Sequence, residues 1–132
     1  MLNKLKQIFK NSDSEESTFQ WRDLVSLAQL DEINAKSFKT PQILFKHSTR
    51  CSISSMAKRR VETLKEPAGT GSVYLLDLIQ FREVSNKIAD QYQVQHQSPQ
   101  WLLIVNGKCV YHASHGNINW VEMNSALSET PS

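Results

Sequence analysis

The segment 42–65 constrains the fold more than any other part of the chain. Three apolar residues at 43–45 predict a buried strand, and residues 47–50 form a polar turn. Beyond Cys51, apolar residues recur close to every 3.6 positions, which predicts a helix. Its expected inner face consists of Ile53, Met56, Ala57, Val61 and Leu64. Cys51 therefore lies where a strand ends and a helix begins.

The start of a helix favours negative charge, because its first backbone N–H groups are unpaired and the helix dipole is positive there. A thiolate at Cys51 would be stabilised by this position, and the thiolate is the reactive form of cysteine. Arg50 adds a cation next to it in the sequence. The residues alone leave two interpretations open, a reactive cysteine or an inert buried thiol, which is common for this residue type.

Strand and helix patterns alternate through the rest of the chain. We expect strands at 21–25, 73–78, 101–105 and 108–113, and helices at 27–37, 80–92 and 119–128. The inner faces of the first two of these helices are Leu27, Leu30, Ile33 and Ala35, and Phe81, Val84, Ile88 and Tyr92.

Two local signals fix the end of this pattern. Asn106-Gly107 between two strands predicts a hairpin, and Asn119 followed by Glu122 predicts the N-cap of the last helix. Alternating units require parallel strands, whereas the hairpin adds antiparallel ones. The expected fold is α/β, with a mixed five-stranded sheet and helices on both faces.

Composition narrows the function classes. A chain of 132 residues with 39% hydrophobic and 21% charged residues is expected to form one globular domain, at 19–132. Its net charge of +2 does not favour nucleic acid, and no apolar run is long enough to span a bilayer. Two cysteines make no disulfide framework, and no Cys/His spacing matches a structural zinc site, so no metal is expected. These features favour a reducing cytoplasm.

Residues 1–18 are expected to be an extension and linker outside the domain. The basic start lacks a cleavage site and is not expected to be a secretory signal. Leu2, Leu5 and Phe9 would share one face of a short helix that touches a membrane surface or a partner, while the alternative is a frayed terminus.

Three separated blocks carry a family resemblance. They are KHSTRCSIS at 46–54, VSNKIADQYQVQHQSPQ at 84–100 and ASHGNI at 113–118. In their order and spacing they resemble the YtxJ-like bacilliredoxins, which are monothiol relatives of glutaredoxin with a thioredoxin-like fold. Members of that family act with the low-molecular-weight thiol bacillithiol. The likeness covers roughly residues 21–127.

The resemblance implies a role for several residues. Cys51 matches the reactive cysteine, and Ser54 stands where dithiol thioredoxins hold a resolving cysteine. Ser98-Pro99 matches the cis-proline pair, beside which the main chain of Gln97 and Ser98 would contact the bound thiol compound. The turn that approaches this ligand matches Gly116 and Asn117, where a bulky side chain would obstruct it. One departure is Ser52, where many members have proline. Serine adds an N–H near the sulfur and loosens the turn.

The remaining conspicuous residues have duller alternatives. His47 is expected either to assist the thiolate or to be a partly exposed turn residue, and His115 either lines the ligand groove or faces solvent. His96 and His112 have no special claim. Cys109 follows the hairpin turn, whereas Pro99 lies at the far end of the preceding strand, up to about 25 Å away. Disulfide partners must lie much closer, so we expect Cys109 to be structural and not paired with Cys51. Most basic clusters such as 58–60 are solvated faces, although this one would attract an acidic thiol or partner.

The expected function is thiol–disulfide exchange, in which Cys51 removes bacillithiol from mixed disulfides with proteins. Bacillithiol would be a co-substrate rather than a tightly bound cofactor, and the second thiol would be free bacillithiol or a partner reductase. One alternative is a redox-sensing or binding module that bacillithiol modifies at Cys51 without turnover. Another is a scaffold that has lost efficient exchange.

Overall fold

A computed structural model describes residues 19–63 and 72–130. Its strands are β1 (Arg22–Asp23), β2 (Gln42–His47), β3 (Ser72–Asp77), β4 (Gln100–Val105) and β5 (Lys108–Ser114). Its helices are α2 (Leu27–Lys36), α3 (Ser52–Thr63), α4 (Arg82–Tyr92), the 3-10 helix η1 (His115–Asn117) and α5 (Trp120–Glu129).

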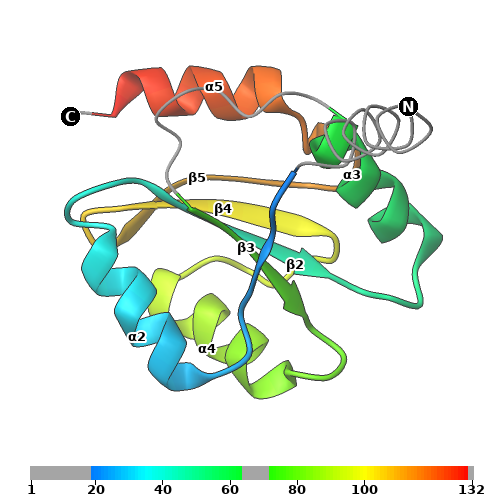
Figure 1. Cartoon of the computed structure of the whole chain (residues 1–132), viewed down its shortest axis with the longest axis horizontal. Coiled ribbons are helices and arrows are strands. Elements are labelled where there is room, and N and C mark those ends of the chain that lie inside the picture. Colours follow the sequence, from blue (N-terminus) through cyan, green and yellow to red (C-terminus); the bar gives the residue numbers. More distant parts are fainter. Residues whose placement is uncertain (1–18, 64–71, 131–132) are drawn as a thin grey trace, which may run out of the picture.

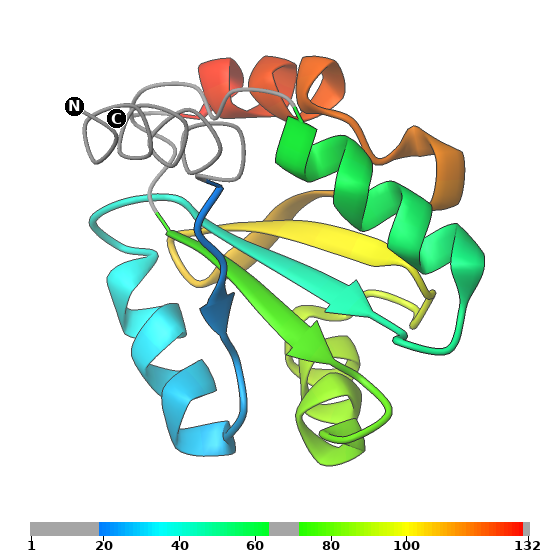
Figure 2. The same ribbon diagram turned by 45° about the vertical axis from the view of Figure 1, so that its right-hand side comes forward.

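The five strands form one mixed sheet in the order β1-β3-β2-β4-β5. β3 pairs in parallel with β1 and β2, whereas β4 runs antiparallel to both β2 and β5. α2 and α4 cover one face of this sheet, and α3 and α5 cover the other (Figures 1 and 2). The predicted α/β fold with helices on both faces is therefore confirmed.

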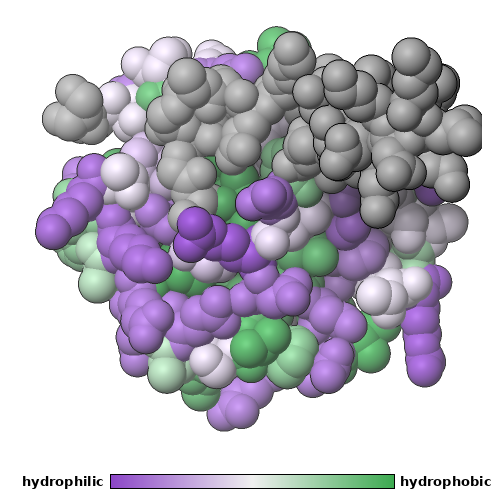
Figure 3. Space-filling model, in the orientation of Figure 1, coloured by the Kyte–Doolittle hydropathy of each residue, from purple (hydrophilic) through white to green (hydrophobic). Residues whose placement is uncertain are grey.

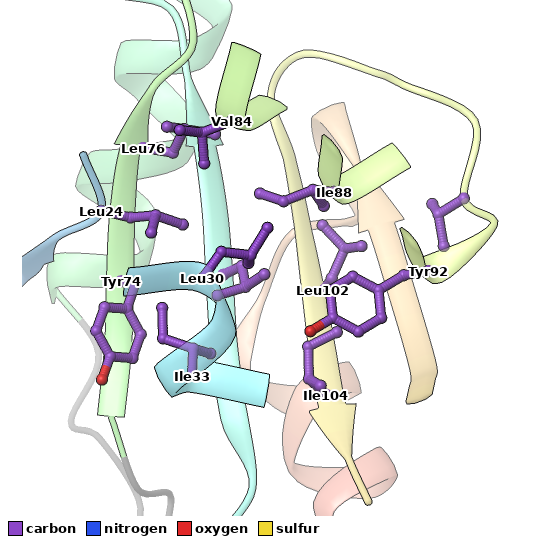
Figure 4. Packing of buried hydrophobic residues seen from close by; sticks show 12 residues of the cluster. Leu24, Leu30, Ile33, Tyr74, Leu76, Val84, Ile88, Tyr92, Leu102 and Ile104 are labelled. Atoms are coloured by element: carbon purple, nitrogen blue, oxygen red, sulfur yellow. The ribbon is translucent and has the colours of Figure 1, made fainter. Parts of the chain in front are cut away.

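β2 and β4 are buried on both faces, as expected from their apolar runs at 43–45 and 101–105. Side chains alternate along a strand, so Leu44 of β2 faces the α2 and α4 layer while Ile43 and Phe45 face the α3 and α5 layer. Figure 4 shows the first of these two cores, in which Leu30 and Ile33 of α2 meet side chains from the sheet and from α4.

The expected inner face of α3 is wrong at two positions. Ile53 and Met56 are 54% and 65% exposed, while Ser54, Ala57 and Val61 are the buried residues of the described helix. The helix is rotated so that the stripe containing Ser54 faces the sheet, because the Ser54 hydroxyl finds polar partners there. An apolar periodicity alone cannot report this, since a serine is counted as polar.

Smaller differences concern α2 and α4. Leu27 and Ala35 of α2 are exposed, so only Leu30 and Ile33 form its buried face. On α4, Val84, Ile88 and Tyr92 are buried as expected, and Phe81 packs partly buried against the same core.

The predicted hairpin and last N-cap are both confirmed. Asn106 and Gly107 have positive φ angles of 53° and 74°, which the tight turn requires. A Cβ atom on Gly107 would lie 2.9 Å from Cζ of Phe38, so a larger residue would also have to displace this exposed ring. At the start of α5, Asn119 Oδ1 accepts a hydrogen bond from the Glu122 backbone N–H at 2.9 Å.

Several expectations lie outside the described residues. They are the extension and linker at 1–18 and the placement of Leu64 on the inner face of its helix. Within the described ranges, no helix is long and apolar enough to cross a membrane.

Candidate functional site

Cys51 occupies the N-cap position of α3, at the carboxyl end of the central strand β2. Its backbone N–H donates to the Ser48 carbonyl at 3.2 Å, which closes the turn after the strand. Its carbonyl accepts the first helical bond, from Ser55 N–H at 3.1 Å. The thiol is free and half-buried. The strand-to-helix junction predicted for this cysteine is therefore confirmed.

Ser54 braces the turn that carries Cys51. Its side chain is fully buried, and its Oγ accepts a hydrogen bond from the Ser48 backbone N–H at 3.0 Å. The same oxygen lies 2.7 Å from Nδ1 of His47. Because Oγ already accepts the amide proton, its own hydroxyl proton is available to Nδ1. A serine at this position thus links the end of β2, the turn and the first turn of α3.

His47 is a buried residue, 7% exposed, so the alternative of a partly exposed turn histidine is wrong. Burial lowers the pKa of His47, and the nearby Lys58 charge lowers it further, against smaller opposite effects of Asp77 and Glu62. The ring is therefore neutral at pH 7. In the tautomer that carries its proton on Nε2, Nδ1 accepts the Ser54 hydroxyl proton.

A second loop lies beside the end of β4 and contains the Ser98–Pro99 peptide bond, which is cis as the resemblance predicted. Pro99 is buried, while Gln97 and Ser98 are half-buried. The Pro99 carbonyl accepts a hydrogen bond from the His115 backbone N–H at 3.1 Å. This bond connects the proline loop to η1, where Gly116 and Asn117 are exposed.

Arg60 fastens the same turn to α3. Its guanidinium donates to the Ile118 carbonyl at 2.7 Å and to the His115 carbonyl at 3.4 Å. The Cys51 helix, the proline loop and η1 are thus joined by hydrogen bonds. His115 is itself exposed and adopts a positive φ of 54°.

The basic cluster at 58–60 is not one solvated face. Lys58 forms an ion pair with Glu62 at 2.6 Å and lies over the Trp21 ring, and Arg60 is held as described. Arg59 is exposed, as is Arg50 next to Cys51. Arg50 therefore supplies an exposed positive charge next to Cys51 in the sequence.

Lys46 is a functional candidate that the sequence analysis did not single out. Its side chain is fully buried, and Nζ donates to the Ser85 carbonyl and lies near Nδ1 of His96, both at 3.2 Å. Burial lowers the pKa of Lys46 to about 8, and burial together with Lys46 lowers the pKa of His96. Gln100 adds a bond from Nε2 to the Gln95 carbonyl at 3.0 Å, so this cluster supports the proline loop from the core side. The sequence signal that could have identified Lys46 is a lysine that directly follows the apolar run of a predicted strand.

Cys109 lies at the opposite end of the sheet, where β5 pairs it with Ile104 and β2 begins. Its thiol is free and donates to the Tyr111 carbonyl at 3.3 Å. Burial raises the pKa of Cys109 to about 11. Cys51 and Cys109 are not joined, and Cys109 packs against the core formed with α2 and α4.

No group of three or more His, Cys, Asp or Glu side chains that could hold a metal ion occurs among residues 19–63 and 72–130. The arrangement around Cys51 instead combines one free thiol at a helix start, a buried serine brace and a proline loop. A site of this kind can perform exchange between a thiolate and a disulfide.

Known proteins are similar to this chain in sequence or in architecture. The sequence model of a family described as monothiol bacilliredoxin BrxC matches residues 22–123. A solved structure of an oxidoreductase candidate with a thioredoxin fold is 30% identical, with a TM-score of 0.71 over 80% of this chain and 91% of that chain. Thioredoxin from Fasciola hepatica is 19% identical, with a TM-score of 0.63 over 83% of this chain and 99% of that chain. Thioredoxin from Malassezia sympodialis is 12% identical, with a TM-score of 0.65 over 83% and 90%, and both thioredoxins show the fold alone.

The two thiols are predicted to differ strongly in reactivity. Iodoacetamide at pH 7.5 should alkylate Cys51 at least 100-fold faster than Cys109, because a thiol whose pKa is about 11 is almost entirely protonated at that pH. Peptide mass spectrometry of timed samples measures both rates. In guanidinium chloride the two rates should converge, and equal rates in the folded protein would contradict the burial of Cys109.

The buried amine of Lys46 should make stability depend on pH. Its pKa is 10.5 in an unfolded chain and about 8 in the folded one, so the unfolded state binds more protons between these values and stability rises with pH by up to about 3 kcal/mol. Lys46→Met should remove this rise, whereas Lys87→Met at an exposed position of α4 should keep it.

Urea unfolding at pH 7 to 10.5 measures this effect as the difference between each variant and the wild type. The subtraction removes the contributions of other groups that titrate in the same range. An identical pH dependence in the wild type and in Lys46→Met would contradict the assignment.

Proposed function

Because the chain belongs to the monothiol bacilliredoxin family, we propose that it removes bacillithiol from mixed disulfides with proteins through Cys51. A thiol redox function follows from the family, and the specific reaction is our proposal. The observation that carries it is the single free thiol at the start of α3 with a buried serine three residues later. Such a site can attack a disulfide, but Cys51 cannot form an internal disulfide with the residue three positions later.

The proposed first step is attack of the Cys51 thiolate on the bacillithiol sulfur. A disulfide forms between Cys51 and bacillithiol, and the protein sulfur leaves as a thiolate that takes a proton from solvent. In the second step the thiolate of another thiol attacks the bacillithiol sulfur, and Cys51 leaves as a thiolate. Free bacillithiol as the second thiol gives bacillithiol disulfide, so that one bacillithiol thiol is consumed for each protein thiol released.

Main-chain groups of Gln97 and Ser98 are proposed to contact the bacillithiol half, with Pro99 setting the position of this loop. Gly116 and Asn117 complete the proposed site from η1, which is bonded to Pro99 and to Arg60. A Cβ atom on Gly116 would meet nothing within 4 Å, so the fold itself does not require a glycine. The open space is where we place the ligand.

The remaining residues of the site support the nucleophile. Arg50 supplies an exposed positive charge next to Cys51, and Ser54 with His47 holds the turn in one conformation. Ser52 is exposed and begins α3. We place the activity in a reducing cytoplasm, in which two free thiols would persist.

Cys51 is predicted to take bacillithiol from a protein. Reduced protein mixed with a substrate that carries a bacillithiol mixed disulfide should gain the bacillithiol mass at Cys51 within seconds to minutes, and an added thiol should regenerate it. Time-resolved mass spectrometry follows both steps, and Cys51→Ser should show no transfer. A stable adduct without regeneration would support the sensing module instead. No transfer would mean that the chain keeps the fold but does not catalyse this exchange.

Enlarging the side chain at position 116 should impair exchange without unfolding the protein. Gly116→Val is expected to lower kcat/KM for a bacillithiol mixed disulfide about tenfold, because the added methyl groups would occupy the proposed ligand space. Its free energy of unfolding should change by no more than about 0.5 kcal/mol, since the position is exposed. Gly116→Ala serves as the matched smaller change. Unchanged kcat/KM in both variants would place the ligand elsewhere.

A further inference from the structure

A cavity of about 400 Å³ lies on the other side of Cys51 from the proline loop. β2 ends at the Cys51 turn and stands between β4, which follows the proline loop, and β3, whose end lines the cavity. Thr49 of the Cys51 turn is part of its wall. A mixed disulfide bound at Cys51 has two halves, and the proline loop is assigned to only one of them.

The walls of this cavity are largely apolar. They are formed by Leu24, Val25, Leu75 and Phe81, together with polar residues of β1, β2, β3 and the loop before α4. A neighbouring hollow of about 350 Å³ shares Val25, Gln80 and Phe81 with it and extends toward Leu27. Figure 3 shows hydrophobic atoms interrupting the polar surface in the lower half of the view, where α2 and α4 begin in Figure 1. The two hollows therefore form one groove that starts at the Cys51 turn.

Two carboxylates line the part of this groove next to the Cys51 turn, whereas Arg82 and Glu83 bring one charge of each sign to the neighbouring hollow. Asp23 and Asp77 line the cavity, and neither forms an ion pair within the described part of the chain, where the recorded pair is Lys58–Glu62. Asp77 Oδ1 accepts hydrogen bonds from the backbone N–H groups of Ile79 and Gln80, and the charge of the carboxylate remains uncompensated. Arg50 and Arg59 are exposed cations that do not line the cavity.

His47 adds an imidazole ring to the wall of the same cavity. The side chain is more than nine-tenths buried and forms part of the cavity wall. Its Nδ1 is engaged by Ser54, and among the described residues no hydrogen bond is recorded for Nε2. A neutral ring with its proton on Nε2 can donate to a peptide carbonyl.

We propose that this groove binds the protein half of the mixed disulfide, and that it prefers a segment with an apolar and a basic residue close to the modified cysteine. The inference rests on the proposed function and adds a substrate preference to it. The apolar side chain would occupy the cavity, the basic side chain would pair with Asp23 and Asp77, and His47 would donate to the peptide backbone. Because the bacillithiol half faces the proline loop, both halves are held on opposite sides of the reacting sulfurs.

The test uses heptapeptides whose central cysteine carries bacillithiol. One peptide has leucine and lysine beside the cysteine, the second has glutamate in place of lysine, and the third has serine in place of leucine. The lysine peptide should exceed the glutamate peptide about tenfold in kcat/KM, which is the effect expected when attraction by a pair of partly exposed carboxylates is replaced by repulsion. The serine peptide should be several-fold poorer than the leucine peptide.

Variants locate this preference. The double change Asp23→Asn with Asp77→Asn should bring the ratio of the lysine to the glutamate peptide close to one, while asparagine still caps the turn at Ile79 and Gln80. Asp90→Asn, an exposed carboxylate on α4 outside the groove, should leave the ratio at about ten. A ratio of one in the wild type, or the same ratio in the double variant as in the wild type, would overturn the proposal.

Two further measurements separate this inference from the proposed function. A small mixed disulfide of bacillithiol with N-acetylcysteine reports exchange without any peptide, so its failure to react would refute the proposed function alone. Binding is then read independently by NMR, with Cys51→Ser protein and peptides whose cysteine is replaced by serine. Selective shifts of the amides of Thr49, Asp77 and Gln80 with the lysine peptide would support docking, and shifts confined to other surfaces would refute it.

Discussion

The hydroxyl of Ser54 determines how Cys51 is presented. It accepts a hydrogen bond from the Ser48 amide and lies within hydrogen-bonding distance of His47, and it does so from a fully buried position on α3. A buried polar group stabilises a structure only when it is satisfied, so these bonds fix the rotation of α3 about its axis. That rotation in turn exposes Ile53 and Met56.

Polar side chains from regular elements also hydrogen-bond to the loops around Cys51. Lys46 and Gln100 support the proline loop from inside the core, whereas Arg60 holds η1 from the helix side. The loops that are proposed to bind substrate are therefore anchored at both ends by side chains from regular elements. Such anchoring keeps short loops in one geometry, which matters for a reaction that requires three sulfur atoms in line.

Local sequence patterns predicted most of the fold. Apolar runs revealed β2, β3 and β4, Asn106-Gly107 revealed the hairpin, and Asn119 revealed the start of α5, because each signal acts over a few residues. At the site, position and chemistry pointed to Cys51, whereas the cis bond before Pro99 followed only from family resemblance. Arg60 could not be found in this way, since its carbonyl partner at Ile118 lies 58 positions along the chain. Apolar periodicity also misplaced the inner face of α3, because it gives a buried serine no weight.

The brace made by Ser54 has an evolutionary consequence. Replacing this serine with cysteine is a small genetic change, and the position would then match a two-cysteine motif. Sulfur is a weak hydrogen-bond acceptor, so the half-buried Ser48 amide would lose most of its partner, at a cost of about 1 kcal/mol. The serine at position 54 is therefore favoured by folding, independently of any role in exchange.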